Sequence, residues 1–212
     1  MLDPHSMMLA LSRQRAVFHS EADFQHAFAW HLHEQFPSAA IRLERPFRSK
    51  LGLLHVDLVA ETDGQLNVIE LKYKTRAISV RQGSEEFDLQ DHGAQPLGRY
   101  DFLKDVARLE SIIVSQSGAQ AWAIMLSNDS AYWSQPRGHD DTSAEFSLAD
   151  GRRVTGSLAW SARASAGTRR NREEPIVLAN QYVLSWQDYS DVGGRSYSRF
   201  RYLALEVPAK AA

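Results

Sequence analysis

The chain contains 212 residues, of which 43% are hydrophobic and 24% charged, and its formal net charge at pH 7 is −2. These values fit one folded globular domain over residues 1–212 and exclude a disordered, fibrous or strongly polycationic protein. Because the sequence contains no cysteine, disulfides, thiolate metal sites and a cysteine nucleophile are excluded as well.

The first fifteen residues, MLDPHSMMLALSRQR, do not have the pattern of a secretory signal, because an acidic residue precedes a very short apolar run. No run of apolar residues in the chain approaches the length needed to span a membrane. We therefore expect no membrane partner and a cytoplasmic location.

The first half of the chain predicts one helix followed by three strands. Ser20, with an acid three residues later, is typical of a helix start, and apolar residues at helical spacing extend the helix over residues 21–35. Residues 40–47 alternate apolar and charged side chains as a strand does. Two more strands are expected around Asp63-Gly64, a strong signal for a two-residue hairpin turn.

A second helix and a further strand follow a predicted polar loop over residues 81–94. Pro96 can begin the helix, whose apolar positions continue toward Gly118. The apolar run AWAIMLS, residues 121–127, predicts a buried strand. The expected order over residues 20–127 is therefore α-β-β-β-α-β.

Residues 128–208 are expected to form a β extension of this core. A hairpin is predicted from residues 144–148 and 153–160, which flank Asp150-Gly151. Residues 161–175 lack periodicity and predict a surface loop, whereas residues 181–186 and 199–207 predict late strands.

Charged residues occur inside the predicted central hairpin, HVDLVAETDGQLNVIELK, where strands normally exclude them. If Asp63-Gly64 forms a two-residue turn, paired residue numbers sum to 63 + 64 = 127, so Asp57 is expected to face Glu70. Lys72 follows Glu70 by two residues and therefore points to the same face of the sheet.

Two facing carboxylates repel each other unless a positive charge lies between them. Mg²⁺ accepts one or two carboxylates together with waters and phosphate oxygens, so Asp57 and Glu70 are candidate metal ligands. Lys72 could orient or deprotonate a water molecule or stabilise charge on phosphorus. A solvated hairpin face, on which Lys72 screens two surface acids, is the alternative for these residues.

Asp57 and Glu70-Leu71-Lys72, within the order α-β-β-β-α-β, resemble the PD-(D/E)xK nuclease superfamily, which has a restriction-endonuclease-like fold. The segments GRYDFLKDVARLE and FRYLALEV also resemble parts of uncharacterised bacterial proteins with this core. Val56 stands where the motif often has proline. The resemblance implies a Mg²⁺-dependent phosphodiesterase acting on DNA, or less often RNA, with Asp57 and Glu70 binding the metal and Lys72 in the active site.

Glu21 is a further catalytic candidate, and three other residues are weaker candidates for substrate binding. Glu21 matches a glutamate that many members of the superfamily carry on the first helix, although a helix-start acid is equally consistent with the pattern. Gln95 and Arg99 could face the site from the second helix, or they could simply belong to an exposed helix start. By the same register, His55 is expected opposite Lys72, where it could touch substrate or act as an ordinary strand-start residue.

Three functions remain open from the sequence. The first is a nuclease that uses Mg²⁺, or Mn²⁺ in its place, to activate water against a phosphodiester bond. The second is a catalytically inactive nuclease fold that binds nucleic acid or a protein partner, and the third is a metal-assisted hydrolase of a small phosphate ester. Nucleic acid would have to be held by local basic segments such as IRLERPFRSK, because the whole chain is not basic. A homodimer is left open.

Overall fold

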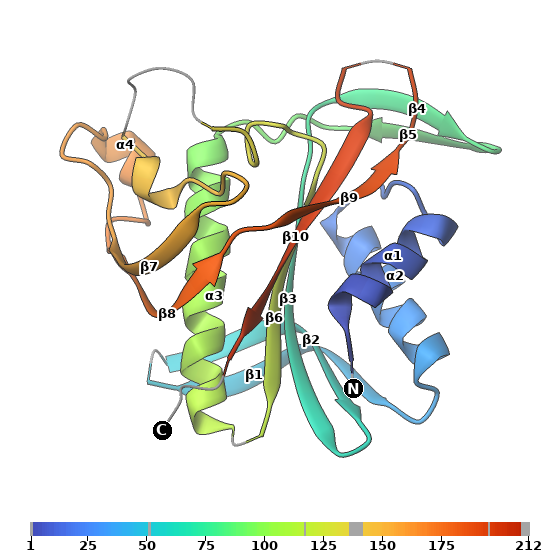
Figure 1. The fold of residues 1–212 in the computed structure, drawn as a ribbon, viewed down its shortest axis with the longest axis horizontal. Coiled ribbons are helices and arrows are strands. Elements are labelled where there is room, and N and C mark those ends of the chain that lie inside the picture. Colours follow the sequence, from blue (N-terminus) through green and yellow to red (C-terminus); the bar gives the residue numbers. More distant parts are fainter. Residues whose placement is uncertain (1, 51, 117, 136–141, 195, 209–212) are drawn as a thin grey trace.

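The computed structural model describes residues 2–50, 52–116, 118–135, 142–194 and 196–208, which form a mixed α/β fold (Figure 1). The helices are α1 (Pro4–Gln14), α2 (Glu21–Gln35), α3 (Gln95–Ser115) and α4 (Ala166–Arg169), with a 3-10 turn, η1, at Ala144–Phe146. The strands are β1 (Ala40–Ser49), β2 (Gly52–Thr62), β3 (Gln65–Lys74), β4 (Ile78–Gln82), β5 (Glu85–Leu89), β6 (Gln120–Ser127), β7 (Arg153–Leu158), β8 (Ile176–Val183), β9 (Trp186–Asp191) and β10 (Arg199–Val207).

The main sheet contains six strands in the order β1-β2-β3-β6-β10-β9. The central pair, β3 and β6, is parallel, and the other neighbours are antiparallel. The hairpins β4–β5 and β7–β8 form separate two-stranded sheets. The chain between β3 and β6 therefore contains both the β4–β5 hairpin and α3.

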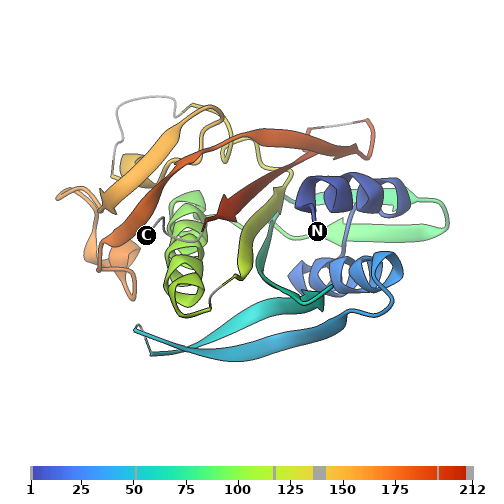
Figure 2. The ribbon, with the colours of Figure 1, turned by 60° about the horizontal axis from the view of Figure 1, so that its bottom comes forward.

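Helices cover both faces of the main sheet (Figures 1 and 2). Helices α1 and α2 pack on one face, where Phe24 and Phe28 share a core with Leu58 and Ile69 of the sheet. Helix α3 packs on the other face. Its core continues from the strands into the β7–β8 hairpin, which encloses α3 from a further side. The charged residues Asp105 and Glu110 of α3 are buried by this packing, whereas Lys104 stays exposed.

The prediction of α2 over residues 21–35 is confirmed. The Ser20 hydroxyl caps the helix by accepting a hydrogen bond from the backbone N–H of Asp23 at 3.1 Å. The predicted apolar side is buried, with Phe24, Phe28 and Leu32 fully inaccessible. The helix begins at Glu21, and this places its first carboxylate beside the sheet.

The predicted register of the central hairpin is also confirmed. Leu58 pairs with Ile69 and Thr62 with Gln65, so each pair sums to 127 as the turn requires. Asp63 and Gly64 have φ values of 50° and 76°, the left-handed conformations that a tight hairpin turn needs and that glycine and aspartate tolerate.

The predicted polar loop over residues 81–94 is wrong in its first part. Residues Glu85–Leu89 pair with Ile78–Gln82 as the hairpin β4–β5, and Phe87 and Leu89 are buried in the core cluster that also contains residues of α1 and α2. The alternation in EEFDL is short and strongly acidic, so burial of its two apolar side chains depends on tertiary packing, such as the stacking of Phe87 on His19 between α1 and α2.

The predicted hairpin around Asp150-Gly151 is wrong. Residues 144–146 form the turn η1, and β7 pairs with β8 instead, across the segment that was expected to be a loop. That segment includes α4, and the Trp160 side chain, which donates a hydrogen bond to the Arg172 carbonyl at 2.7 Å, helps to fix it. The strand partner was thus chosen by long-range packing on α3 and not by the nearest turn.

Helix α1 was not predicted. Asp3 caps it, and Met7, Met8 and Leu11 bury its inner side against the sheet and α2. Among the described residues, no helix is both long enough and apolar enough to cross a membrane.

Candidate active site

Strand β2 separates from β3 at Asp57. The ladder between the two strands ends at the pair Leu58–Ile69, and the Asp57 carboxylate instead accepts a hydrogen bond from the backbone N–H of Leu71 at 2.7 Å. Opposite Asp57 on β1, Glu44 has a left-handed φ of 51°. The outer part of the β1–β2 hairpin then turns toward α3. The expected face-to-face pairing of Asp57 with Glu70 is therefore replaced by an acid that caps the free edge of β3.

Side chains continue along this edge as acceptors for backbone donors of β3. Every second residue of the strand donates its N–H to one of them, as a regular strand would to a neighbour. Leu71 and Tyr73 of β3 donate to the side chains of Asp57 at 2.7 Å and Glu21 at 2.8 Å, and Thr75, directly after the strand, donates to His92 at 3.0 Å. Because buried backbone donors require partners, the free edge of β3 fixes where the two acids sit.

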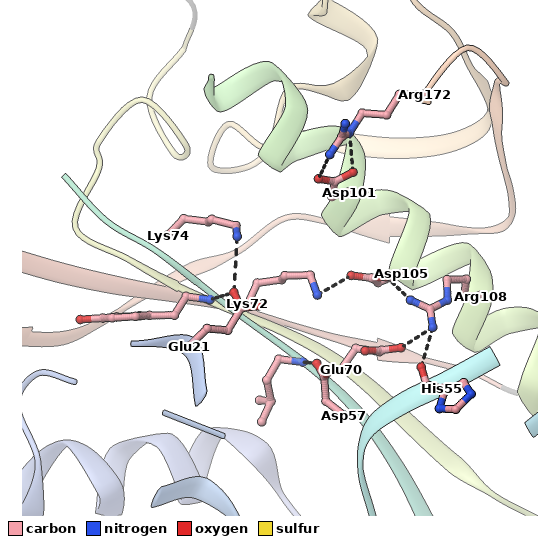
Figure 3. Close-up of polar contacts among 12 residues, drawn as sticks. Glu21, His55, Asp57, Glu70, Lys72, Lys74, Asp101, Asp105, Arg108 and Arg172 are labelled. Atoms are coloured by element: carbon pink, nitrogen blue, oxygen red, sulfur yellow. Dashed lines mark hydrogen bonds and ion pairs between the residues drawn. The ribbon is translucent and has the colours of Figure 1, made fainter. Parts of the chain in front are cut away.

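Glu70 and Lys72 point from β3 toward α3, where they meet two charged side chains of that helix (Figure 3). Lys72 Nζ lies 3.0 Å from Asp105 Oδ2. Arg108 Nη1 lies 2.7 Å from Asp105 Oδ1, and Arg108 Nη2 lies 3.5 Å from Glu70 Oε1. Glu70 and Asp105 are only 2% and 5% exposed, so the four side chains form a charge cluster between sheet and helix.

The ionised form of Glu70 is strongly disfavoured. Burial, followed by repulsion from Asp105 and Asp57, raises the pKa of Glu70 to about 9, and attraction by Arg108 and Lys72 offsets only part of the shift. Glu70 Oε1 is also buried without a hydrogen-bond partner among the described residues. Additional positive charge at this oxygen would therefore stabilise the carboxylate.

Lys72 is held as an ammonium group. Burial alone lowers the pKa of Lys72, but the combined attraction of Asp105, Asp57 and Glu21 outweighs burial and raises the pKa above the ordinary value for lysine. An amine that stays protonated cannot accept a proton from water at neutral pH. In this arrangement Lys72 can donate hydrogen bonds and stabilise negative charge.

Glu21 joins the cluster from α2. Its Oε2 accepts the hydrogen bond from Tyr73 and lies 3.4 Å from Lys74 Nζ. The side chain is about one-third exposed. Glu21 is therefore a partly solvated acid that follows Asp57 along the free edge of β3.

The three weaker sequence candidates lie elsewhere. The His55 side chain is exposed, and its backbone carbonyl accepts a hydrogen bond from Arg108. His55 does not pair with Lys72 because β2 has already left β3 at that point. Gln95 donates to Asp129 at 2.8 Å and Arg99 to the Ala131 carbonyl at 2.5 Å. These two side chains brace the segment after β6, and among the described residues no hydrogen bond or ion pair joins them to Asp57 or Glu70.

Two residues of the cluster, Asp105 and Arg108, were missed by the sequence analysis. Together with Asp101 they form a polar stripe at positions i, i+4 and i+7 of α3, a pattern typical of a solvent-facing side. The sequence therefore contains the polar stripe, but such a stripe is usually interpreted as a helix face exposed to solvent. Only the placement of α3 over β3 shows that Asp105 and Arg108 face the motif.

Any metal ion at this place would rely on oxygen ligands. Among the described residues, no three histidine, aspartate or glutamate side chains gather in positions that could hold a metal ion. Asp57 and Glu70 offer two carboxylates near one another (Figure 3), and Mg²⁺ commonly uses one or two carboxylates with water and substrate oxygens.

Comparisons of this chain with protein-family models, with curated proteins and with solved structures found no match. The fold defines a mixed α/β protein with a mainly antiparallel six-stranded sheet covered by helices.

Proposed function

We propose that this chain is a Mg²⁺-dependent nuclease of the PD-(D/E)xK type, which hydrolyses phosphodiester bonds in DNA, or less preferably RNA, with Mn²⁺ able to replace Mg²⁺. The observation that carries the proposal is the surroundings of Glu70. Its carboxylate is buried with Asp57 and Asp105 nearby, and burial with their repulsion raises its pKa to about 9. Such a group gains more from a bound cation than an exposed acid does.

The order of elements supports the restriction-endonuclease-like core that this proposal includes. The chain runs α2, β1, β2, β3, α3 and β6, in the order α-β-β-β-α-β, and the hairpin β4–β5 is inserted before α3. The motif residues occupy the central strands, at the point where β2 and β3 diverge. Where the ladder ends, the Asp57 side chain takes the place of the missing strand partner by accepting the N–H of Leu71.

Each side chain has a defined part in the proposed reaction. Asp57 and Glu70 would hold the metal, which when bound supplies Lewis-acid activation of water and neutralises phosphate charge. The ammonium group of Lys72, fixed by Asp105, would stabilise the charge that develops on the phosphoryl oxygens. Glu21, with one oxygen bonded to the N–H of Tyr73, has a second oxygen with which to orient a water molecule.

A basic surface on the β1–β2 hairpin could bind the phosphates of the substrate. Its members are exposed, and its three arginines pair with the apolar residues Val59, Val56 and Leu53 of β2. They are Arg42, Arg45, Arg48 and Lys50. Arginine and lysine contacts to phosphates give affinity without sequence preference, so we expect binding that weakens as salt concentration rises.

Incubation of the purified chain with single-stranded, duplex and branched DNA and with RNA, in Mg²⁺ or Mn²⁺, tests the proposal. We expect cleavage that EDTA abolishes and that Lys72→Ala and Glu70→Gln reduce by orders of magnitude, because such site residues act as a unit. Lys104→Ala is the matched control, since Lys104 is an exposed lysine on α3. Cleavage no greater than that of Lys72→Ala on every substrate contradicts the proposal.

The second candidate function is a nuclease fold that binds nucleic acid or a protein without cutting. One observation favours it: Lys72 and Arg108 already pair with the buried acids Asp105 and Glu70. A site that is neutralised by its own side chains does not require a metal. Uptake of Mn²⁺ by the wild-type chain, lost in Asp57→Asn, would decide for the nuclease, and absence of uptake with intact nucleic-acid binding would decide for this alternative.

A further inference from the structure

Arg108 occupies a central place in the charge cluster. It projects from α3 into the space between the helix and the diverging strands, and its side chain is 22% exposed. One guanidinium nitrogen, Nη1, bonds Asp105 at 2.7 Å. The other, Nη2, donates to the carbonyl of His55 at 2.5 Å and lies 3.5 Å from Glu70 Oε1 (Figure 3).

The contact between Arg108 and Glu70 is the weakest of the three. Its 3.5 Å separation exceeds that of a charge-assisted hydrogen bond, and Glu70 Oε1 has no hydrogen-bond partner in the described chain. Asp105 and His55 together therefore hold the guanidinium group in place. Arg108 stays near Glu70 without satisfying that carboxylate.

The charges of the cluster are almost balanced without any metal ion. While Glu70 holds its proton, three carboxylates and three cations sum to zero, and once Glu70 releases the proton to bind a metal, four carboxylates and three cations give −4 + 3 = −1. These groups are Glu21, Asp57, Glu70, Asp105, Lys72, Lys74 and Arg108. A divalent cation brings this sum to +1 while Arg108 remains, and to 0 if the guanidinium group moves away. The positive charge of Arg108 and that of an added divalent cation therefore repel each other at this site.

We propose that Arg108 is a built-in counter-ion that competes with the divalent metal for Glu70, anchored for that role by Asp105 and the His55 carbonyl. This inference rests on the proposed function, because it concerns the metal site of the same enzyme. Metal binding at Asp57 and Glu70 then requires the guanidinium group to withdraw from Glu70. Arg108 acts by setting metal affinity and is a positioning residue rather than a catalytic one.

The test is a Mn²⁺ titration of the 212-residue chain in which free Mn²⁺ is measured by electron paramagnetic resonance. Arg108→Gln removes the competing charge, and we expect the dissociation constant for Mn²⁺ to fall about three- to tenfold, the scale set by one ion pair that no longer has to be broken. Arg172→Gln is the matched control. It breaks another α3 ion pair, to Asp101 at 2.7 Å, with similar exposure of 27% and at a distance from Glu70 (Figure 3).

A second variant separates competition from a simple change in charge. Arg108→Gln leaves Asp105 with one fewer cation, and the added negative charge alone would attract Mn²⁺. The double variant Asp105→Asn/Arg108→Gln restores the net charge of the wild type. If Arg108 competes for Glu70, the double variant also binds Mn²⁺ more tightly than the wild type, and Glu70→Gln added to it removes the gain.

Three results overturn the inference, and they can be told apart. Equal affinity of Arg108→Gln and wild type, with Mn²⁺ bound by both, overturns the role of Arg108 and leaves the proposed function intact. The same holds if the gain disappears in the double variant. No Mn²⁺ uptake by any of the proteins overturns the proposed function and, with it, this inference. Circular dichroism of each variant verifies that it is folded before the titration.

Discussion

Replacement of Glu70 by glutamine should change how the stability of the metal-free protein depends on pH. The folded chain raises the pKa of Glu70 to about 9, from an ordinary value of 4.5. Between these values, native Glu70 holds a proton that the unfolded chain has released. The unfolded state then binds fewer protons, so the free energy of unfolding falls as pH rises, by up to ~1.4 kcal/mol per pH unit for one group.

The sign follows from the raised pKa of an acid. Below pH 4.5 the carboxyl is protonated in both states and contributes no pH dependence. Across neutral pH, ionisation of Glu70 in the unfolded chain draws the equilibrium toward unfolding. Between pH 6 and pH 8, Glu70 therefore lowers the free energy of unfolding by at most about 3 kcal/mol. Glutamine keeps the size and the hydrogen-bonding groups of the protonated side chain and cannot ionise. Glu70→Gln should therefore be increasingly more stable than the wild type as pH rises.

Urea unfolding at pH 6, 7 and 8 with EDTA, followed by tryptophan fluorescence, measures this difference. Subtracting the unfolding free energy of the wild type from that of Glu70→Gln at each pH cancels the contributions of the histidines and of all other titrating groups that the two proteins share. Glu61→Gln is the control, because Glu61 lies on β2 and is exposed, and its curve should parallel that of the wild type. If the difference between Glu70→Gln and wild type stays constant across these pH values, the reasoning about Glu70 is refuted.

Two further predictions concern how α3 is held. Gly98→Ala should lower the free energy of unfolding by ~1–3 kcal/mol, because a Cβ there would overlap the hydroxyl of buried Tyr132. The control Gly93→Ala has open space around it and should change the free energy of unfolding by less than ~0.5 kcal/mol. Equal unfolding midpoints for both variants would contradict this prediction. Glu110→Ala should lower the free energy of unfolding by ~3 kcal/mol or more, because the Glu110 carboxylate accepts four hydrogen bonds from β8 at 2.7–2.9 Å. The control Asp101→Ala breaks a partly exposed ion pair and should lower the free energy of unfolding by no more than ~1 kcal/mol. Chemical denaturation measures both, and a Glu110→Ala cost as small as that of Asp101→Ala would show that these bonds do not anchor β8.

Local signals predicted the elements that carry the motif. The Ser20 cap and the apolar spacing behind it determine α2, since a hydroxyl acceptor and a buried stripe act within a few turns of helix. The Asp63-Gly64 turn determines the register of β2 and β3, because a two-residue turn leaves one pairing available. These were the predictions on which the position of Glu70 and Lys72 depended.

Strand pairing between distant segments was beyond local signals. Residues 144–148 have the composition of a strand but form η1, and β7 instead pairs with β8 beyond α4. Apolar residues in a short run can fill either a strand or a packed turn. The outcome was decided by which segment completed the core around α3.

The sequence by itself determined that an aspartate, a glutamate and a lysine would lie on a central hairpin, because chain-local turn geometry and strand alternation fix that arrangement. Only the tertiary structure decided that β2 leaves β3 at Asp57 and that α3 brings Asp105 and Arg108 against Glu70. The reason is physical: contacts between elements far apart in sequence depend on how whole surfaces pack, and a polar stripe on a helix does not reveal whether water or another charge will face it.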